Sequence, residues 1–288
     1  MKASTMINNK GVEHFFGGNL ETAEKEFRKA IKDNPQNASA YNNLAFLLQQ
    51  KGELAEAEKF LRKSIKVNPE GSSARLNLGN ILVQKGEGEK GAGMLVEAIR
   101  RDPRNVLAWE SLATLAMMQH DYISAEDCWE KVTFLKPGVG KYWVQSAVVK
   151  AALKKYEEAA ASLHRALEID SSFAFAWQQL GMVEFLRNNF GTARTAFLNS
   201  LALDPDQVPA RYHLALIYLA NNDIEAAKKE FDHILVLEPG NVKVLTERGV
   251  LELGTENKNA AAAFFKKALG VDATYTRAAD YLKQIQVG

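Results

Sequence analysis

Prolines recur along this chain at a fixed interval of 34 residues. Two intervals separate Pro137 from Pro205, and Ser171 takes the place between them. The prolines on this period are Pro35, Pro69, Pro103, Pro137, Pro205 and Pro239. A period of this length, kept over most of a 288-residue chain, is the sequence signature of a solenoid made of one repeated unit. It divides the sequence into eight windows: 4–37, 38–71, 72–105, 106–139, 140–173, 174–207, 208–241 and 242–275.

Every window carries the residue pattern of two packed helices. In its second half, one position is always small and the position four residues later is always large. The small residues are Ala23, Ala57, Gly91, Ala125, Ala159, Ala193, Ala227 and Ala261, and the large ones are Phe27, Leu61, Leu95, Trp129, Leu163, Phe197, Phe231 and Phe265. A second apolar stripe, such as Tyr41, Leu44 and Leu48, occupies the first half. Each window therefore predicts a helical hairpin, which the proline ends because it cannot continue the second helix.

Two stretches carry a family resemblance: "AYNNLAFLLQQKGELAEAEKFLRKSIKVNP" and "AFAWQQLGMVEFLRNNFGTARTAFLNSLALDP". Both resemble the tetratricopeptide repeat (TPR) family, and the resemblance recurs across residues 4–275 as eight tandem repeats. It implies an all-α fold of the alpha-alpha superhelix class, a right-handed TPR solenoid. Gly91 replaces the usual alanine, and His14 and Lys150 stand where the first helix usually has an apolar residue. Residues 276–288 are expected to form a capping helix over the last repeat.

The stretch "KGEGEKGAGML" holds Gly86, Gly88 and Gly91 in the spacing of a dinucleotide-binding turn. That turn needs a preceding strand, and the period places a helix there. Gly86 instead belongs to the column between paired helices, where a left-handed residue is expected. This turn column is Gly18, Gly52, Gly86, His120, Lys154, Asn188, Asn222 and Glu256. Gly88, Gly91 and Gly93 fall in the second helix, which predicts that this helix is locally weak.

The residues typical of catalysis and of cofactor or metal binding do not cluster in this sequence. No two of the five histidines lie four residues apart, the motif H-E-x-x-H is absent, and Cys128 is the only cysteine. Cys128 adjoins a packing stripe and is interpreted as structural. The sequence therefore predicts a protein that is not an enzyme and has no cofactor.

Composition narrows the classes of partner. The net charge of +1 does not favour a nucleic-acid partner, and without an apolar run of 18 residues we expect no membrane insertion. A single cysteine and an N-terminus unlike a signal peptide favour a cytoplasmic location, although a chain trimmed of its export signal would look the same.

The face of the first helix opposite its packing stripe is almost free of charge. Six residues of each window lie on this face: the second, fifth, sixth, ninth, twelfth and thirteenth. Of these 48 positions in the eight windows, only four are charged: Glu110, Lys141, Lys243 and Glu247. The family resemblance implies that this face lines a concave groove that binds peptides and protein segments. The candidate groove residues are Asn9, Asn43, Phe46, Asn77, Asn80, Gln145, Gln179, Met182, Tyr212 and His213.

An amide row is the most informative part of that face. Asn9, Asn43 and Asn77 share one column, which continues as Ser111, Gln145, Gln179, His213 and Glu247. Each amide can both donate and accept a hydrogen bond, so the row can pair with a peptide main chain. It resembles the asparagine ladder of some TPR arrays; alternatively, the amides only solvate the floor of the groove. The basic residues of the carboxylate clamp found in chaperone-binding members are missing.

These features favour a protein–protein interaction adaptor or scaffold that binds extended or helical peptide segments in the groove. Two alternatives stay open. The same groove could hold another copy of the chain and build a homo-oligomer, or the chain could be the accessory TPR domain of a larger enzyme.

Overall fold

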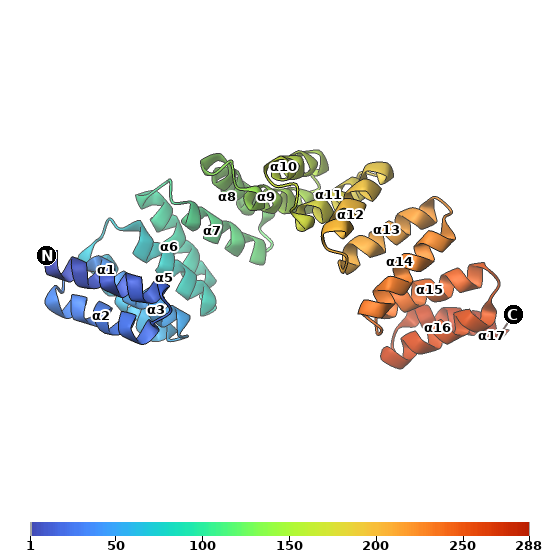
Figure 1. Ribbon diagram of the computed structural model, residues 1–288, viewed down its shortest axis with the longest axis horizontal. Coiled ribbons are helices and arrows are strands. Elements are labelled where there is room, and N and C mark those ends of the chain that lie inside the picture. The colour runs from blue at the N-terminus through green and yellow to red at the C-terminus, as the bar shows by residue number, and fades with distance from the viewer. Residues whose placement is uncertain (1, 288) are drawn as a thin grey trace. The chain divides into compact units, whose positions relative to one another are not determined.

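The computed structural model describes residues 2–287, and it describes side chains as far as Ile285. Within this range the chain consists of α-helices joined by short turns, with no strand, which confirms the predicted all-α fold (Figure 1). The helices are α1 (Lys2–Phe16), α2 (Leu20–Asp33), α3 (Ala38–Gln50), α4 (Leu54–Val67), α5 (Ser72–Gln84), α6 (Gly88–Arg101), α7 (Val106–Met118), α8 (Tyr122–Leu135), α9 (Gly140–Ala152), α10 (Tyr156–Ile169), α11 (Ala174–Leu186), α12 (Phe190–Leu203), α13 (Val208–Ala220), α14 (Ile224–Leu237), α15 (Val242–Gly254), α16 (Lys258–Val271) and α17 (Thr276–Val287).

The chain forms two compact units. The N-terminal unit ends at Pro137 and holds α1 to α8, and the C-terminal unit starts at Gly138 and holds α9 to α17. Within each unit the helices pack as consecutive hairpins, such as α1 with α2 and α3 with α4, and each hairpin also packs on the next. In the C-terminal unit, α17 packs on α16 and α15. We keep the eight windows as our proposed division of the repeats.

The turn inside each hairpin depends on one residue in the left-handed region. All eight members of the turn column have φ between 59° and 82°, the glycines and the five other residues alike. At Gly86, the amide of Gly86 donates to the Val83 carbonyl at 2.9 Å, and that of Glu87 donates to the Leu82 carbonyl at 2.8 Å. These two bonds satisfy the last carbonyls of α5 in a Schellman motif. The interpretation of Gly86 as a helix-ending turn residue is therefore confirmed.

In four hairpins the large residue of the second helix packs against a glycine of the first helix. Phe197 and Phe265 are fully buried, and their rings lie directly over Gly181 and Gly249. A Cβ atom built on Gly181 would come within 2.5 Å of the Phe197 ring. The glycine thus makes room for an aromatic side chain at the centre of the hairpin, where packing is dense and extra atoms are poorly tolerated.

Gly91 corrects one expectation from the sequence. It is buried where α6 crosses α5, opposite Gly79. A Cβ atom on Gly91 would lie 2.9 Å from the carbonyl oxygen of Gly79, and a Cβ atom on Gly79 would lie 3.1 Å from that of Gly91. The two backbones approach so closely that only glycine fits. Gly91 is therefore a packing residue of this hairpin, whereas the exposed Gly93 keeps the character of a helix-weakening glycine.

We expect Gly93→Ala and Gly91→Ala to change stability in opposite directions. Gly93 has open space where its Cβ would point, so Gly93→Ala should raise the free energy of unfolding by about 1 kcal/mol. Gly91→Ala should lower it, because the new methyl group meets backbone atoms of α5. Urea denaturation followed by circular dichroism measures both variants. A stabilising Gly91→Ala would contradict the close approach of the two helices.

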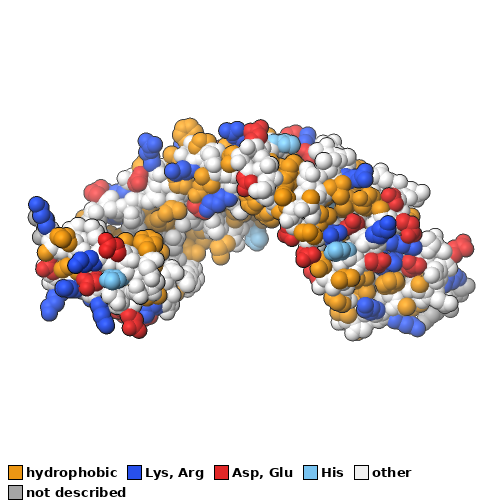
Figure 2. Space-filling view, in the orientation of Figure 1, with side chains coloured by type: hydrophobic (Ala, Val, Ile, Leu, Met, Phe, Trp, Pro, Cys, Tyr) orange, Lys and Arg blue, Asp and Glu red, His pale blue; other side chains and the backbone are white. Residues whose placement is uncertain are grey.

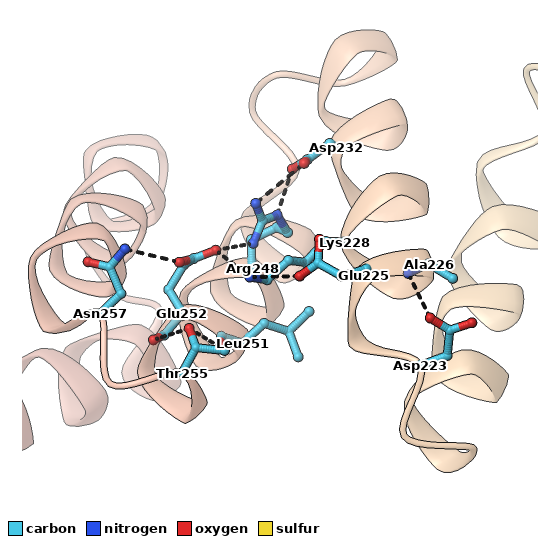
Figure 3. A network of polar contacts seen from close by, with 10 residues as sticks. All are labelled: Asp223, Glu225, Ala226, Lys228, Asp232, Arg248, Leu251, Glu252, Thr255 and Asn257. Carbon is cyan, nitrogen blue, oxygen red and sulfur yellow. Dashed lines mark hydrogen bonds and ion pairs between the residues drawn. The ribbon is translucent and has the colours of Figure 1, made fainter.

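A buried ion pair on α15 connects this helix to α14 and to the N-cap of α16 (Figure 3). Arg248 of α15 is only 8% exposed; its Nε lies 2.6 Å from Oδ1 of Asp232 on α14, and its Nη1 lies 2.8 Å from Oε1 of Glu252. Oε1 of Glu252 also lies 3.3 Å from Nζ of Lys228. Its Oε2 accepts a hydrogen bond of 3.3 Å from Nδ2 of Asn257, the N-cap of α16. Both charges of the central pair are thus balanced and hydrogen-bonded, as burial requires.

Candidate functional site

A hollow of about 440 Å³ lies on the first-helix face of the N-terminal unit. Helices α1, α3 and α5 supply most of its lining, with further residues from α4 and the turn after it. The lining residues are Asn8, Asn9, Val12, Ala38, Ser39, Asn42, Asn43, Ser64, Asn68, Gly71, Ser73 and Ala74. We call this the amide hollow. Five of its twelve lining residues are asparagines and none is charged, so it offers neutral hydrogen-bonding groups.

Asparagines of successive repeats are hydrogen-bonded to each other beside this hollow. Nδ2 of Asn43 donates to Oδ1 of Asn8 at 3.0 Å, and Nδ2 of Asn77 donates to Oδ1 of Asn42 at 2.9 Å. Each partner lies 35 residues earlier, one repeat and one residue away. The same bond therefore occurs between α1 and α3 and again between α3 and α5.

This pairing uses only part of each amide's capacity. Asn43 commits one N–H to Asn8, and the oxygen of Asn42 is taken by Asn77. An amide group has two N–H donors and an oxygen with two lone pairs, so α3 still presents a donor at Asn42 and an acceptor at Asn43. Adjacent donor and acceptor groups match the carbonyl and N–H of a peptide main chain. The asparagines therefore also join neighbouring repeats.

A small apolar recess adjoins the amide hollow. It measures about 90 Å³ and is lined by Val12, Phe15, Phe16, Phe27, Asn43 and Phe46. We call it the phenyl recess. The ring of Phe15 lies 5.5 Å from that of Phe46 and 5.7 Å from that of Phe16, between centroids.

The structure divides the predicted groove residues between the two units. Asn9 and Asn43 line the amide hollow, Phe46 lines the phenyl recess, and Asn77 bonds to Asn42. Asn80 is half-buried on α5 and belongs to neither lining. The other five lie in the C-terminal unit, all half-buried: Gln145 on α9, Gln179 and Met182 on α11, and Tyr212 and His213 on α13.

Aromatic packing explains the positions of Tyr212 and His213. The His213 ring stacks on Phe197 with centroids 5.7 Å apart, and its Nδ1 lies 2.8 Å from the carbonyl oxygen of Pro209, to which it donates. Burial, above all, lowers the pKa of His213; the Pro209 carbonyl opposes this change and Lys243 reinforces it. The imidazole is therefore mostly neutral near neutral pH. Nζ of Lys243 lies 4.1 Å from the centroid of Tyr212, a cation–π contact.

Two kinds of feature bear on a catalytic role within the described range: clusters of metal-binding side chains and a reactive thiol. No group of three or more histidine, cysteine or acidic side chains within this range could hold a metal ion. Cys128 is 4% exposed, and burial, helped by Asp127 and Asp121, raises the pKa of its thiol to about 11. The thiol is therefore protonated near neutral pH and is a poor nucleophile.

None of the helices in the described range has the length and apolar character that a membrane span requires. Figure 2 shows side chains of both charges interspersed with apolar ones on the face that it draws.

Several residues of the site were not among the sequence candidates. Asn8, Asn42, Ser39 and Ser73 line the amide hollow, and Phe15 and Phe16 line the recess. A sequence signal for the asparagines existed, because Asn8 and Asn42 immediately precede Asn9 and Asn43 in adjacent columns. Phe15 and Phe16 also lie on the weakly charged face of the first helix, but nothing in the sequence singled them out on it.

Comparison with family models settles what the repeats are. Models described as tetratricopeptide repeat match residues 26–59, 47–93, 76–127, 140–173 and 184–245. The chain belongs to the tetratricopeptide repeat family. TPR repeats generally mediate protein–protein interaction, on a fold that is typically a non-catalytic scaffold. None of the curated proteins compared matches this chain.

Solved structures share the TPR fold at low sequence identity. A chain of the APC/C hetero-tetramer Cut9–Hcn1 has a TM-score of 0.59 at 17% identity. The match covers 92% of this chain and 52% of the APC/C chain, so this protein spans about half the length of that chain. A crystal structure of MamA protein has a TM-score of 0.54 at 20% identity, covering 60% of this chain and 94% of that one. The C-terminal part of a TPR repeat-containing protein from Cytophaga hutchinsonii has a TM-score of 0.60 at 16% identity, covering 95% and 98%.

Proposed function

We propose that this TPR protein is a protein–protein interaction scaffold that captures extended peptide segments at the first-helix face of its N-terminal unit. The observation that carries the proposal is the amide hollow. It has a volume of about 440 Å³, and its lining includes five asparagines and no charged residue. The general role of TPR repeats in protein interaction supports the proposal, and the hollow is the surface at which we propose that binding occurs.

An extended peptide suits this surface better than a helical one. The main chain of a helix bonds to itself, whereas an extended segment leaves its N–H and C=O groups to be paired by its partner. Asn42 and Asn43 keep a donor and an acceptor side by side on α3 after their internal bonds are made. A peptide group that displaces water from these amides therefore keeps its hydrogen bonds. Contacts of this kind read the main chain and carry little information about side chains.

The double variant Asn42→Ala with Asn43→Ala should bind such peptides about ten-fold more weakly or worse, because it removes the free donor of Asn42 and the free acceptor of Asn43. Each lost hydrogen bond is worth about 0.5–1.5 kcal/mol, and two of them approach the factor of ten that corresponds to about 1.4 kcal/mol. Fluorescence anisotropy of labelled peptides, obtained from a random peptide library selected on the full chain, measures the change. The loss should be similar for peptides of different sequence.

A matched variant separates binding from folding. Asn259→Ala removes an exposed asparagine from α16, in the other unit, and should leave binding unchanged. The double variant also leaves Asn8, which is 5% exposed, without its bond to Asn43, so its thermal unfolding is recorded in parallel. Unchanged affinity in a double variant that stays folded would refute the role of the amides.

A further inference from the structure

Exposed aromatic side chains gather beside the amide hollow. Phe16 is 83% exposed and Phe46 is 40% exposed, although both are large and apolar. They rim the phenyl recess, whose inner wall includes Phe27, only 1% exposed. Water in contact with such a surface is released when an apolar group covers it, so the recess favours an apolar side chain from outside.

The recess and the hollow are two parts of one surface. Asn43 and Val12 line both of them. In an extended chain, successive side chains point to opposite sides and rise by about 3.3 Å per residue. A segment whose main chain pairs with the amide of Asn43 therefore carries a neighbouring side chain to the mouth of the recess.

The same surface disfavours charged side chains. None of the residues that line the hollow or the recess is charged. A charged group held against them would give up part of its hydration without gaining an ionic partner. Neutral amides and hydroxyls, in contrast, can replace the water around a peptide group or a small polar side chain.

We propose that the segment bound here is uncharged and anchored by one large apolar side chain, of the leucine, methionine or phenylalanine type, that sits in the phenyl recess. This inference rests on the proposed function and adds a side-chain specificity to it. The amides of the hollow hold the main chain, and Phe16 and Phe46 select the anchor. A charged segment finds no ionic partner on this surface, and a charged side chain cannot serve as the anchor in the phenyl recess.

A phage-displayed library of random twelve-residue peptides, selected on the full chain, tests the proposal. Selected peptides should share one large apolar residue flanked by uncharged ones. A fluorescein-labelled synthetic copy should bind about ten-fold more tightly than the same peptide with alanine at the anchor, since burying one large apolar side chain yields at least that factor. In the variants Phe16→Ala and Phe46→Ala the two peptides should bind almost alike. Peptides enriched in charged residues would overturn the inference.

A control variant and the amide variant make the outcomes distinct. Phe134→Ala removes a phenylalanine of α8 that is 77% exposed and lies outside both linings. It should leave unchanged the affinity for the selected peptide and for its copy with alanine at the anchor. If Asn42→Ala with Asn43→Ala weakens binding but the Phe16 and Phe46 variants still distinguish the two peptides, the anchor site is refuted and the proposed function stands. If neither set of variants affects binding, or no peptide is enriched, both are refuted.

Discussion

Arg248→Ala should lower the free energy of unfolding by about 3–5 kcal/mol, the usual cost of removing one partner from a buried ion pair. Glu252 is 9% exposed and would keep its charge with only Lys228 at 3.3 Å and the amide of Asn257 beside it. The guanidinium also lies 5.0 Å from the centroid of Phe264, so the truncation removes packing as well as charge. Urea denaturation measures the loss, and hydrogen exchange should locate it in α14 to α16.

Two comparison variants show whether burial causes this cost. Arg62 pairs with Glu58 at 2.7 Å but its side chain is 58% exposed, so Arg62→Ala should cost less than about 1 kcal/mol. Arg248→Met combined with Glu252→Leu removes both charges and keeps apolar volume, and it should recover much of the stability lost in Arg248→Ala. Equal effects of Arg62→Ala and Arg248→Ala would contradict the importance of burial.

The same network gives a pH dependence with a defined sign. The hydrogen bond from Arg248 makes the largest contribution to the pKa of Glu252 and lowers it below its ordinary value of 4.5; burial opposes this and Lys228 adds to it. A carboxyl group with a lower pKa in the folded state stabilises the fold above its ordinary pKa, and this contribution disappears as the pH falls through the folded value. The stability difference between the wild type and Arg248→Ala should therefore narrow below pH 4.5.

The period in the sequence predicted the helices well because each hairpin repeats the same local chemistry. The left-handed residue of each turn illustrates this: an alignment of Gly18, Gly52 and Gly86 with Asn188 and Asn222 indicates the backbone that the structure has. Gly91 was misjudged because a glycine in a helix looks weak until the backbone across from it is known. Only the structure shows the Gly79 carbonyl 2.9 Å from where its Cβ would lie.

The candidate site was predictable as a face but not as a set of contacts. The scarcity of charge on the first helices indicated the surface on which the amide hollow and the phenyl recess lie. The bond from Asn43 to Asn8 was not foreseen, because it joins positions of adjacent columns across a repeat boundary. The network around Arg248 was also missed, since Arg248 and Glu252 interrupt apolar columns and their balance depends on Asp232 and Lys228 from the preceding helix.

Gly181→Ala should lower the free energy of unfolding by about 1–3 kcal/mol, the usual cost of overpacking a core. The new methyl carbon would lie 2.5 Å from Cδ1 and from Cε1 of Phe197, far inside van der Waals contact. The ring has little room to move, because Phe197 is fully buried and His213 stacks on it. Since alanine is by itself the better helix former, any loss of stability must come from this contact. Thermal and urea unfolding of the purified chain measure it.

The rest of the chain shows how the clash can be relieved. In two other hairpins an alanine at the equivalent position packs with a leucine, Ala45 with Leu61 and Ala147 with Leu163, whereas Ala215 packs with Phe231 in the hairpin of α13 and α14. Phe197→Leu should therefore cost less in the Gly181→Ala background than in the wild type, giving a favourable coupling between the two sites in a double-mutant cycle. Gly191→Ala on α12 serves as the control, because its Cβ would meet open space, and it should not destabilise the protein. Additive effects of Gly181→Ala and Phe197→Leu would show that the glycine does not make room for the ring.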